Sequence, residues 1–121
     1  MQPKTPKLLE DIRDAAAFVA QVTRGISEDD YERNRMLRQS IERNFEIIGE
    51  AMRRLTQHDP ATAHRIGGHA QIIAFRNRLI HGYDLIDHSL VWEVIQRDVP
   101  ALLAEVVALL GVDEGPVDAR L

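Results

Sequence analysis

Four residues within an eight-residue stretch carry side chains suited to phosphate chemistry: Arg76, Asn77, His81 and Tyr83. A guanidinium can hold a phosphate through two parallel hydrogen bonds, and an imidazole can move a proton near neutral pH. Together these two groups could bind and cleave a phosphodiester. Arginine and histidine are also ordinary residues at the C-terminal end of a helix, where cations stabilise the helix dipole. Spacing alone leaves both interpretations open.

The apolar spacing from Gln71 to His81 predicts a helix that carries Arg76 and ends at Gly82. Glycine at this place predicts a left-handed residue that closes the helix. At about 100° per residue, Arg76 and His81 point about 140° apart around the helix axis. One copy of the helix therefore does not aim both side chains at one small target. They would converge if the last turn were frayed, or if a second copy of the helix supplied the complementary half.

Three longer apolar patterns predict the helices that position this segment, at residues 4–24, 27–56 and 88–110. We expect Pro100 to kink the last of them, because proline removes a backbone hydrogen bond. A short helical turn is expected at residues 61–65. The fold class is therefore all-α, an up-down bundle of four to five helices. We expect one domain at residues 1–111 and a flexible C-terminal tail at residues 112–121.

Composition excludes several classes of site. The 121 residues include no cysteine, so disulfides and zinc–thiolate sites are ruled out. The separations between His58, His64 and His69 do not match a helical zinc pair, and we expect no metal site. No apolar run approaches the roughly 20 residues of a membrane span, and no signal peptide is evident, which predicts a cytoplasmic protein without membrane contacts. The net charge of −4 argues against broad non-specific binding of nucleic acid.

A local basic groove would therefore be needed for any RNA substrate. Arg53 and Arg54 either belong to a solvated, salt-bridged face or border a phosphate path. Asn44 interrupts the apolar stripe of its helix, where it either sets the register of packing or lines a polar pocket. Glu50 lies near the edge of the same stripe and could pair with a basic group across the bundle.

The motif Arg76-x4-His81-x-Tyr83 resembles the R-x4-6-H-x-Y signature of HepT-type toxins in the HEPN superfamily. Ile47-Ile48-Gly49-Glu50-Ala51 is similar to the I-G-E-A helix of that family. Three later segments also resemble it, in the order Phe75 to Asp84, Ile86 to Trp92 and Asp98-Val99-Pro100. The resemblance covers residues 6 to 110. The connector at residues 57–69 departs from the proline-tryptophan pattern of the family.

The resemblance implies a HEPN-like homodimer and a metal-independent endoribonuclease, the toxin of a type VII toxin–antitoxin system, that needs no cofactor. Arg76 would then hold the scissile phosphate of the RNA. His81 would deprotonate the ribose 2′-OH or protonate the leaving 5′-oxygen. Asn77 would orient the imidazole or the phosphate.

The same resemblance implies a minimal nucleotidyltransferase as the antitoxin. It would transfer AMP to Tyr83, and the adenylate would block the entry of RNA. The homodimer alone and a larger hetero-oligomer with this partner both stay open. The alternative for Tyr83 is a structural role, as a buried phenol that caps the turn. Two further interpretations remain: a non-catalytic nucleotide-binding or interaction partner of a nucleotidyltransferase, and a plain dimeric structural bundle.

Overall fold

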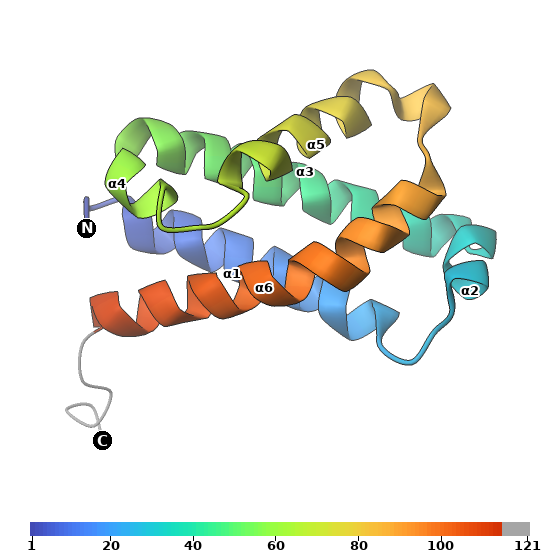
Figure 1. The fold of residues 1–121 in the computed structure, drawn as a ribbon, viewed down its shortest axis with the longest axis horizontal. Coiled ribbons are helices and arrows are strands. Elements are labelled where there is room, and N and C mark those ends of the chain that lie inside the picture. The colour runs from blue at the N-terminus through green and yellow to red at the C-terminus, as the bar shows by residue number, and fades with distance from the viewer. Residues whose placement is uncertain (115–121) are drawn as a thin grey trace.

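Six α-helices and one 3-10 turn make up residues 1–114, the part of the chain that this computed structural model describes (Figure 1). The long helices alternate in direction, which confirms the predicted all-α, up-down bundle. Residues 1–114 contain no strand. The elements are α1 (Thr5–Thr23), α2 (Glu28–Arg33), α3 (Arg35–His58), α4 (Pro60–Ala63), α5 (His69–His81), η1 (Tyr83–Leu85) and α6 (His88–Glu114).

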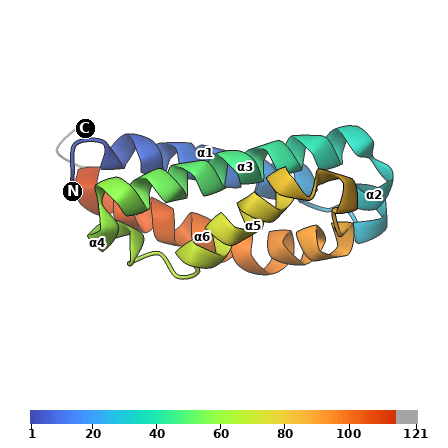
Figure 2. The same cartoon turned by 90° about the horizontal axis from the view of Figure 1, so that it is seen from above.

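The core forms where α1 packs against α3 and α6, while α5 packs against the other side of α3 (Figure 2). Apolar residues at helical spacing point inward from each helix because burial removes their surface from water. Ile12 of α1, Phe45 and Ile48 of α3 and Val106 of α6 are fully buried. A groove of about 480 Å³ is lined by residues of both α5 and α6, together with the glycines of the turn before α5.

The predicted helix at residues 27–56 is in fact two helices, α2 and α3, so that prediction was wrong. Ser27 begins α2 with a capping box, in which its hydroxyl accepts from the Asp30 amide. Asn34 has an extended backbone and ends α2, and its side-chain oxygen accepts from the Leu37 amide to start α3. The helix breaks at Asn34 because the asparagine side chain can hydrogen-bond to the backbone itself, which favours a cap over a position inside a helix.

Tyr31 attaches the short helix α2 to the bundle. Its side chain is fully buried, and its ring lies 5.6 Å from that of Trp92 and 6.4 Å from that of His88, measured between ring centroids. Aromatic pairs at these separations add to the burial energy. Helix α2 therefore packs against the first turns of α6.

Asn44 does not occupy the core. It is half-buried, and its amide donates to the Ser40 carbonyl of the same helix at 2.8 Å. Phe45, the next residue, fills the core position instead. The amide hydrogen bond of Asn44 thus stays within α3, and the register and pocket roles that the sequence suggested for this residue remain predictions.

Asp59 connects the N-terminal segment to the end of α3. Its carboxylate accepts from the Thr5 and Thr62 hydroxyls at 2.8 Å and 2.7 Å, and from the backbone amides of Thr62 and Gln2. The hydroxyl of Thr62, then that of Thr5, stabilise the charged form and lower the pKa of Asp59 to about 2. Asp59 therefore serves as a buried, charged cap for α4.

Helix α6 runs through Pro100 and changes direction along its length, as the predicted kink requires (Figure 1). It begins after Asp87, whose side chain accepts from the Ser89 and Leu90 amides. It does not end near Gly111 but continues to Glu114, so the predicted end is wrong by one turn. The rest of the predicted tail, residues 115–121, lies outside the described residues. Among the described helices, none is both long and apolar enough to cross a membrane.

Candidate active site on helix α5

Helix α5 carries the arginine and histidine of the motif, and its buried face fixes their directions. Ile72, Phe75 and Leu79 are buried at helical spacing. The Phe75 ring meets the Phe45 ring of α3 edge-on, with 5.1 Å between centroids. Because this apolar stripe faces the bundle, Arg76 and His81 leave the helix on its flanks.

Gly82 ends α5, but not in the predicted left-handed conformation. Its φ is −111°, and its amide donates to the Arg78 carbonyl at 2.9 Å. A Cβ atom at this position would lie 2.9 Å from the same carbonyl oxygen. Glycine is therefore required here because the backbone approaches too closely for a side chain, and not because of a positive φ.

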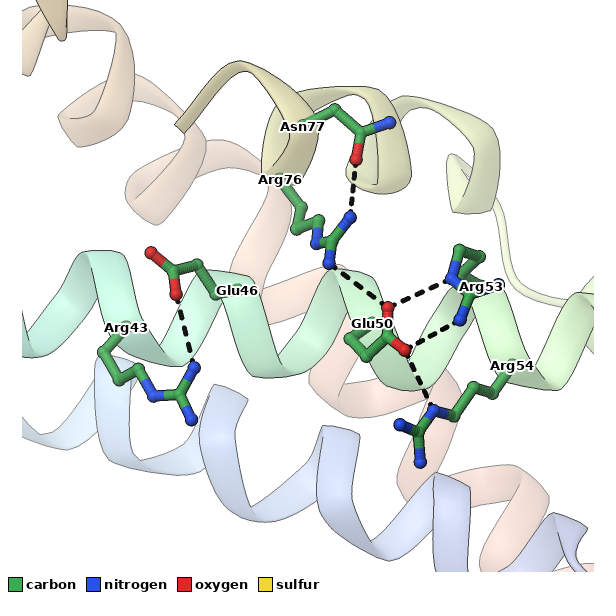
Figure 3. Close-up of polar contacts among 7 residues, drawn as sticks. All are labelled: Arg43, Glu46, Glu50, Arg53, Arg54, Arg76 and Asn77. Atoms are coloured by element: carbon green, nitrogen blue, oxygen red, sulfur yellow. Dashed lines mark hydrogen bonds and ion pairs between the residues drawn. The ribbon is translucent and has the colours of Figure 1, made fainter. Parts of the chain in front are cut away.

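Arg76 lies on the flank of α5 that faces α3 (Figure 3). Its Nη2 donates to Glu50 Oε1 at 3.3 Å and its Nη1 donates to Asn77 Oδ1 at 2.8 Å. Only 23% of the side chain is exposed, and its Nε is buried without a hydrogen-bond partner among the described residues. The guanidinium is thus held between an acceptor on α3 and an acceptor on α5.

Glu50 also binds the two arginines that follow it on α3. Arg53 donates from Nε and Nη2 at 3.0 Å and 2.8 Å, and Arg54 donates from Nε at 2.9 Å (Figure 3). The hydrogen bonds from Arg53, followed by those from Arg54, lower the pKa of Glu50 to about 2. The carboxylate therefore stays ionised and shares its charge among three guanidiniums. The predicted pairing of Glu50 across the bundle is confirmed by its contact with Arg76.

We call the hollow beside this cluster the Arg76 depression; it has a volume of about 260 Å³. Its charged lining is balanced, with three arginines and three carboxylates: Arg43, Arg54, Arg76, Asp11, Glu46 and Glu50. Asp11 is paired with Lys7 and Glu46 with Arg43. The sequence left open whether Arg53 and Arg54 lie on a salt-bridged face, and their pairing with Glu50 shows that they do.

His81 lies in the last turn of α5 and does not line the Arg76 depression. It is exposed and lines a second pocket of about 360 Å³, the His81 pocket, together with Arg78, Leu85, Asp87 and residues of α6. Arg76 is not part of this pocket. A single copy of the chain therefore does not bring Arg76 and His81 together, in agreement with their predicted angular separation.

Tyr83 begins the η1 turn directly after the motif helix, and 77% of it is exposed. Leu85 of the same turn is 84% exposed. This exposure is incompatible with the alternative in which Tyr83 is a buried phenol. The phenol is free to react with, or bind, a second molecule.

His64 and His69 lie together in the connector, with 4.9 Å between ring centroids. The Nδ1 of each ring contacts a backbone carbonyl, that of Pro60 for His64 and that of Ile66 for His69. Within residues 1–114, no three histidine, aspartate or glutamate side chains gather as a potential metal site.

Two residues with a place in the site were not recognised from the sequence. Gly49 allows Arg76 to lie against α3, since an added Cβ would be 2.2 Å from the Arg76 Cβ. A glycine in the middle of a long helix costs stability and was the signal that could have identified this contact. Arg78 lines the His81 pocket. In the sequence it is indistinguishable from the basic residues that are common near the C-terminal end of a helix.

Comparison with known proteins shows the family to which this arrangement belongs. The family model described as "Ribonuclease HepT-like" matches residues 12–109. A protein of Methanocaldococcus jannaschii named "Putative RNase MJ1380" is 34% identical over 98 residues, which cover 81% of this chain and 89% of that protein. No solved structure matches the chain.

Two further relatives come from other organisms. "Putative RNase TTE0752" of Caldanaerobacter subterraneus subsp. tengcongensis is 32% identical over 88% of this chain and 96% of its own length. "Probable ribonuclease HepT" of Thermococcus cleftensis is 30% identical over 78% of this chain and 84% of its own length. Since the family model covers most of the chain and these relatives match it along most of their length, the chain belongs to the HepT-like ribonuclease family.

Proposed function

We propose that this protein is a metal-independent endoribonuclease that cleaves RNA by attack of the ribose 2′-OH on the adjacent phosphate. The observation that carries the proposal is the position of His81, exposed at the end of α5 on the wall of an open pocket, in a chain of the HepT-like ribonuclease family. An imidazole at a pocket wall can reach a bound substrate and exchange protons with it near neutral pH.

In the proposed reaction the 2′-oxygen forms a bond to phosphorus and the bond from phosphorus to the 5′-oxygen breaks. The products are a 2′,3′-cyclic phosphate and a free 5′-hydroxyl. His81 removes the 2′-OH proton or gives a proton to the leaving 5′-oxygen. Arg76 holds the scissile phosphate and stabilises the charge that builds on its oxygens in the transition state. Asn77 supports Arg76, whose Nη1 donates to its side-chain oxygen.

A metal ion is not required in this scheme because the RNA supplies its own nucleophile. Metal-dependent nucleases use the ion largely to activate a water and to stabilise phosphate charge. Here the 2′-OH replaces the water, and Arg76 supplies the positive charge. EDTA should therefore leave the reaction unaffected.

The proposal includes a homodimer in which the α5 helices of two copies line a shared cleft. It is supported by the positions of Arg76 and His81 in two different hollows of one copy. In a two-fold symmetric pair, the Arg76 flank of one copy can face the His81 flank of its partner. The shared cleft would then contain two sites, each with Arg76 from one copy and His81 from the other.

We further propose that the ribonuclease is the toxin of a type VII toxin–antitoxin system in the cytoplasm. Its antitoxin would be a nucleotidyltransferase that transfers AMP to Tyr83, in a homodimer or a larger hetero-oligomer. Supporting this, Tyr83 is 77% exposed and is two residues from His81. An adenylate at this position would add a negative phosphate and a bulky nucleoside beside the proposed RNA path.

A second candidate is a non-catalytic partner of a nucleotidyltransferase, in which Arg76 and His81 dock a nucleotide or the partner itself. The balanced charge of the Arg76 depression favours docking of the partner protein, because a site for a polyanion such as RNA is expected to carry an excess of positive charge. A purely structural bundle is the third candidate. In that case Arg76→Ala would alter stability but no activity.

The test is cleavage of a mixed RNA substrate by the purified, unmodified protein in the presence of EDTA, beside the His81→Ala variant. We expect the wild type to cleave and the variant to be inactive while remaining folded by circular dichroism. Equal cleavage by both proteins would remove His81 from the mechanism. No cleavage by folded wild type would instead favour the nucleotidyltransferase partner.

A further inference from the structure

Glu50 is the acceptor that joins α3 to the arginine of the motif. Its two carboxylate oxygens accept four hydrogen bonds from three guanidiniums, those of Arg53, Arg54 and Arg76 (Figure 3). Arg53 and Arg54 come from the same helix, one turn away. Arg76 is 26 residues distant in sequence and belongs to α5. Glu50 is therefore positioned by its own helix before it contacts Arg76.

Gly49, the neighbour of Glu50, brings Arg76 into reach. Atoms added at the Gly49 Cβ position would lie 2.2 Å from Arg76 Cβ and 2.5 Å from Cγ. No side chain larger than hydrogen fits there without movement, since such separations are far below van der Waals contact. The aliphatic part of Arg76 thus lies directly on the α3 backbone, and only its guanidinium extends beyond it.

The guanidinium is then held from two sides. Nη2 donates to Glu50 and Nη1 donates to Asn77, while the Nε–H is buried with no partner among the described residues. A buried donor without a partner is unfavourable. The arrangement nevertheless keeps this arginine in place, with Glu50 as its one ion-pair partner within residues 1–114. The other carboxylates of the depression, Asp11 and Glu46, are paired with Lys7 and Arg43.

From these contacts we infer that Glu50, next to Gly49, is a positioning residue that sets the direction of the Arg76 guanidinium for phosphate binding. The inference rests on the ribonuclease function proposed above. Glutamine replaces Glu50 only in part, because it keeps one acceptor oxygen while its NH₂ group presents donors to guanidiniums that are themselves only donors. Loss of the charge and of one acceptor would weaken the hold of position 50 on Arg76. The guanidinium could then rotate away from the substrate phosphate.

The test compares Glu50→Gln with a control, Glu93→Gln. Each glutamate pairs with an arginine of its own helix, Glu50 on α3 and Glu93 on α6. Glu93 pairs with Arg97 and does not line the Arg76 depression. Three quantities are measured on each full-length protein: RNA cleavage as kcat and KM, thermal unfolding, and the ¹⁵N NMR signal of the Arg76 Nε–H. That signal is assigned from its absence in Arg76→Lys.

For Glu50→Gln we expect kcat/KM to fall about 10- to 100-fold, which is the usual effect of a misplaced binding group. Complete loss of the site would lower kcat/KM much further. The buried Arg76 Nε–H should also shift and exchange faster with water, while the protein remains folded. Glu93→Gln should stay within about twofold of the wild type, as expected for loss of an exposed ion pair. A purely structural role for Glu50 would lower the unfolding temperature without moving the Arg76 signal.

The two proposals can fail separately. If the wild type and Glu50→Gln cleave RNA equally well, the positioning role is wrong while the ribonuclease stands. If the wild type cleaves no RNA, the ribonuclease proposal is wrong, and an unchanged Arg76 signal in Glu50→Gln would overturn the positioning role too. Should Glu50→Gln not fold, Glu50→Asp carries the same test, because it keeps the charge but shortens the reach toward Arg76.

Discussion

The side chain of Arg76 crosses α3 directly over Gly49, with only 2.2 Å between the Arg76 Cβ and the position of a Cβ added to the glycine. This contact sets how closely α5 approaches α3. It also connects the fold to the candidate site, because the residue that makes the approach is the arginine proposed to bind phosphate. A change at Gly49 should therefore affect both stability and activity.

Replacing Gly49 by alanine should destabilise the protein by about 1–3 kcal/mol, the usual cost of forcing extra atoms into a packed interface. The change raises helix propensity by up to about 1 kcal/mol, so the observed loss should be smaller than the steric cost alone. Urea unfolding followed by the fluorescence of the single tryptophan, Trp92, measures it. RNA cleavage should fall as Arg76 is displaced.

Gly111→Ala is the matched control on α6. A Cβ added at Gly111 meets nothing within 4 Å, so only the gain in helix propensity should remain. We expect the free energy of unfolding to stay the same or to rise slightly. Equal destabilisation by the two substitutions would mean that contact with Arg76 is not what requires glycine at position 49.

Much of the fold followed from apolar periodicity. The stripe of Leu8, Ile12 and Val19 on α1 points into the core as its spacing indicates. Periodicity did not reveal the break at Asn34, because one cap interrupts a helix without altering the apolar pattern around it. It also did not predict that α6 would continue past Gly111.

The candidate site was only partly accessible from the sequence. The helix, its end at Gly82 and the separation of Arg76 from His81 followed from 3.6-residue geometry. The contact between Arg76 and Glu50 did not, since the two residues are 26 apart in the chain and their contact depends on how α3 and α5 cross. The sequence suggested a partner for Glu50 but could not say which basic group it would be. Roles in catalysis stay predictions for Arg76, Asn77, His81 and Tyr83.

Asp59 should make stability depend on pH in the acid range. Its pKa is lowered to about 2 in the folded protein, so the carboxylate stabilises the fold above its ordinary pKa near 3.8. That contribution is lost as pH falls through the folded pKa, between about pH 4 and pH 2. Glu50, whose pKa is lowered in the same direction, adds to the loss. Unfolding free energies measured from pH 7 to pH 2 should show this decline.

In Asp59→Asn the decline should be shallower. At pH 7 the variant should be less stable by about 1.5–3 kcal/mol, the range for a hydrogen bond to a charged group. Asp14→Asn serves as control, because Asp14 lies on the exposed face of α1 and, within residues 1–114, pairs only with Arg13. If Asp59→Asn and the wild type lose stability in parallel below pH 4, Asp59 does not carry the acid dependence.

Coexpression with a neighbouring nucleotidyltransferase should add one adenylate per chain at Tyr83. The chain has two tyrosines, and the other, Tyr31, is fully buried. Intact-mass spectrometry should show the added mass on the wild type and on Tyr31→Phe, but not on Tyr83→Phe. An equal shift on Tyr83→Phe would place the modification elsewhere. The modified protein should cleave RNA less than the unmodified protein.

Mixed dimers can establish whether each active site is shared between two copies. We would coexpress Arg76→Ala and His81→Ala chains that carry different tags, both of which should be inactive when expressed alone. If one copy supplies Arg76 and its partner supplies His81, half of the sites in a mixed dimer contain both native residues. With random pairing, activity should return to about a quarter of the wild-type value, because half of the dimers are mixed.

If both groups of a site come from the same copy, every site lacks one of them and no activity returns. Recovery would also require that the protein is at least a dimer, because monomers of either variant lack a complete pair.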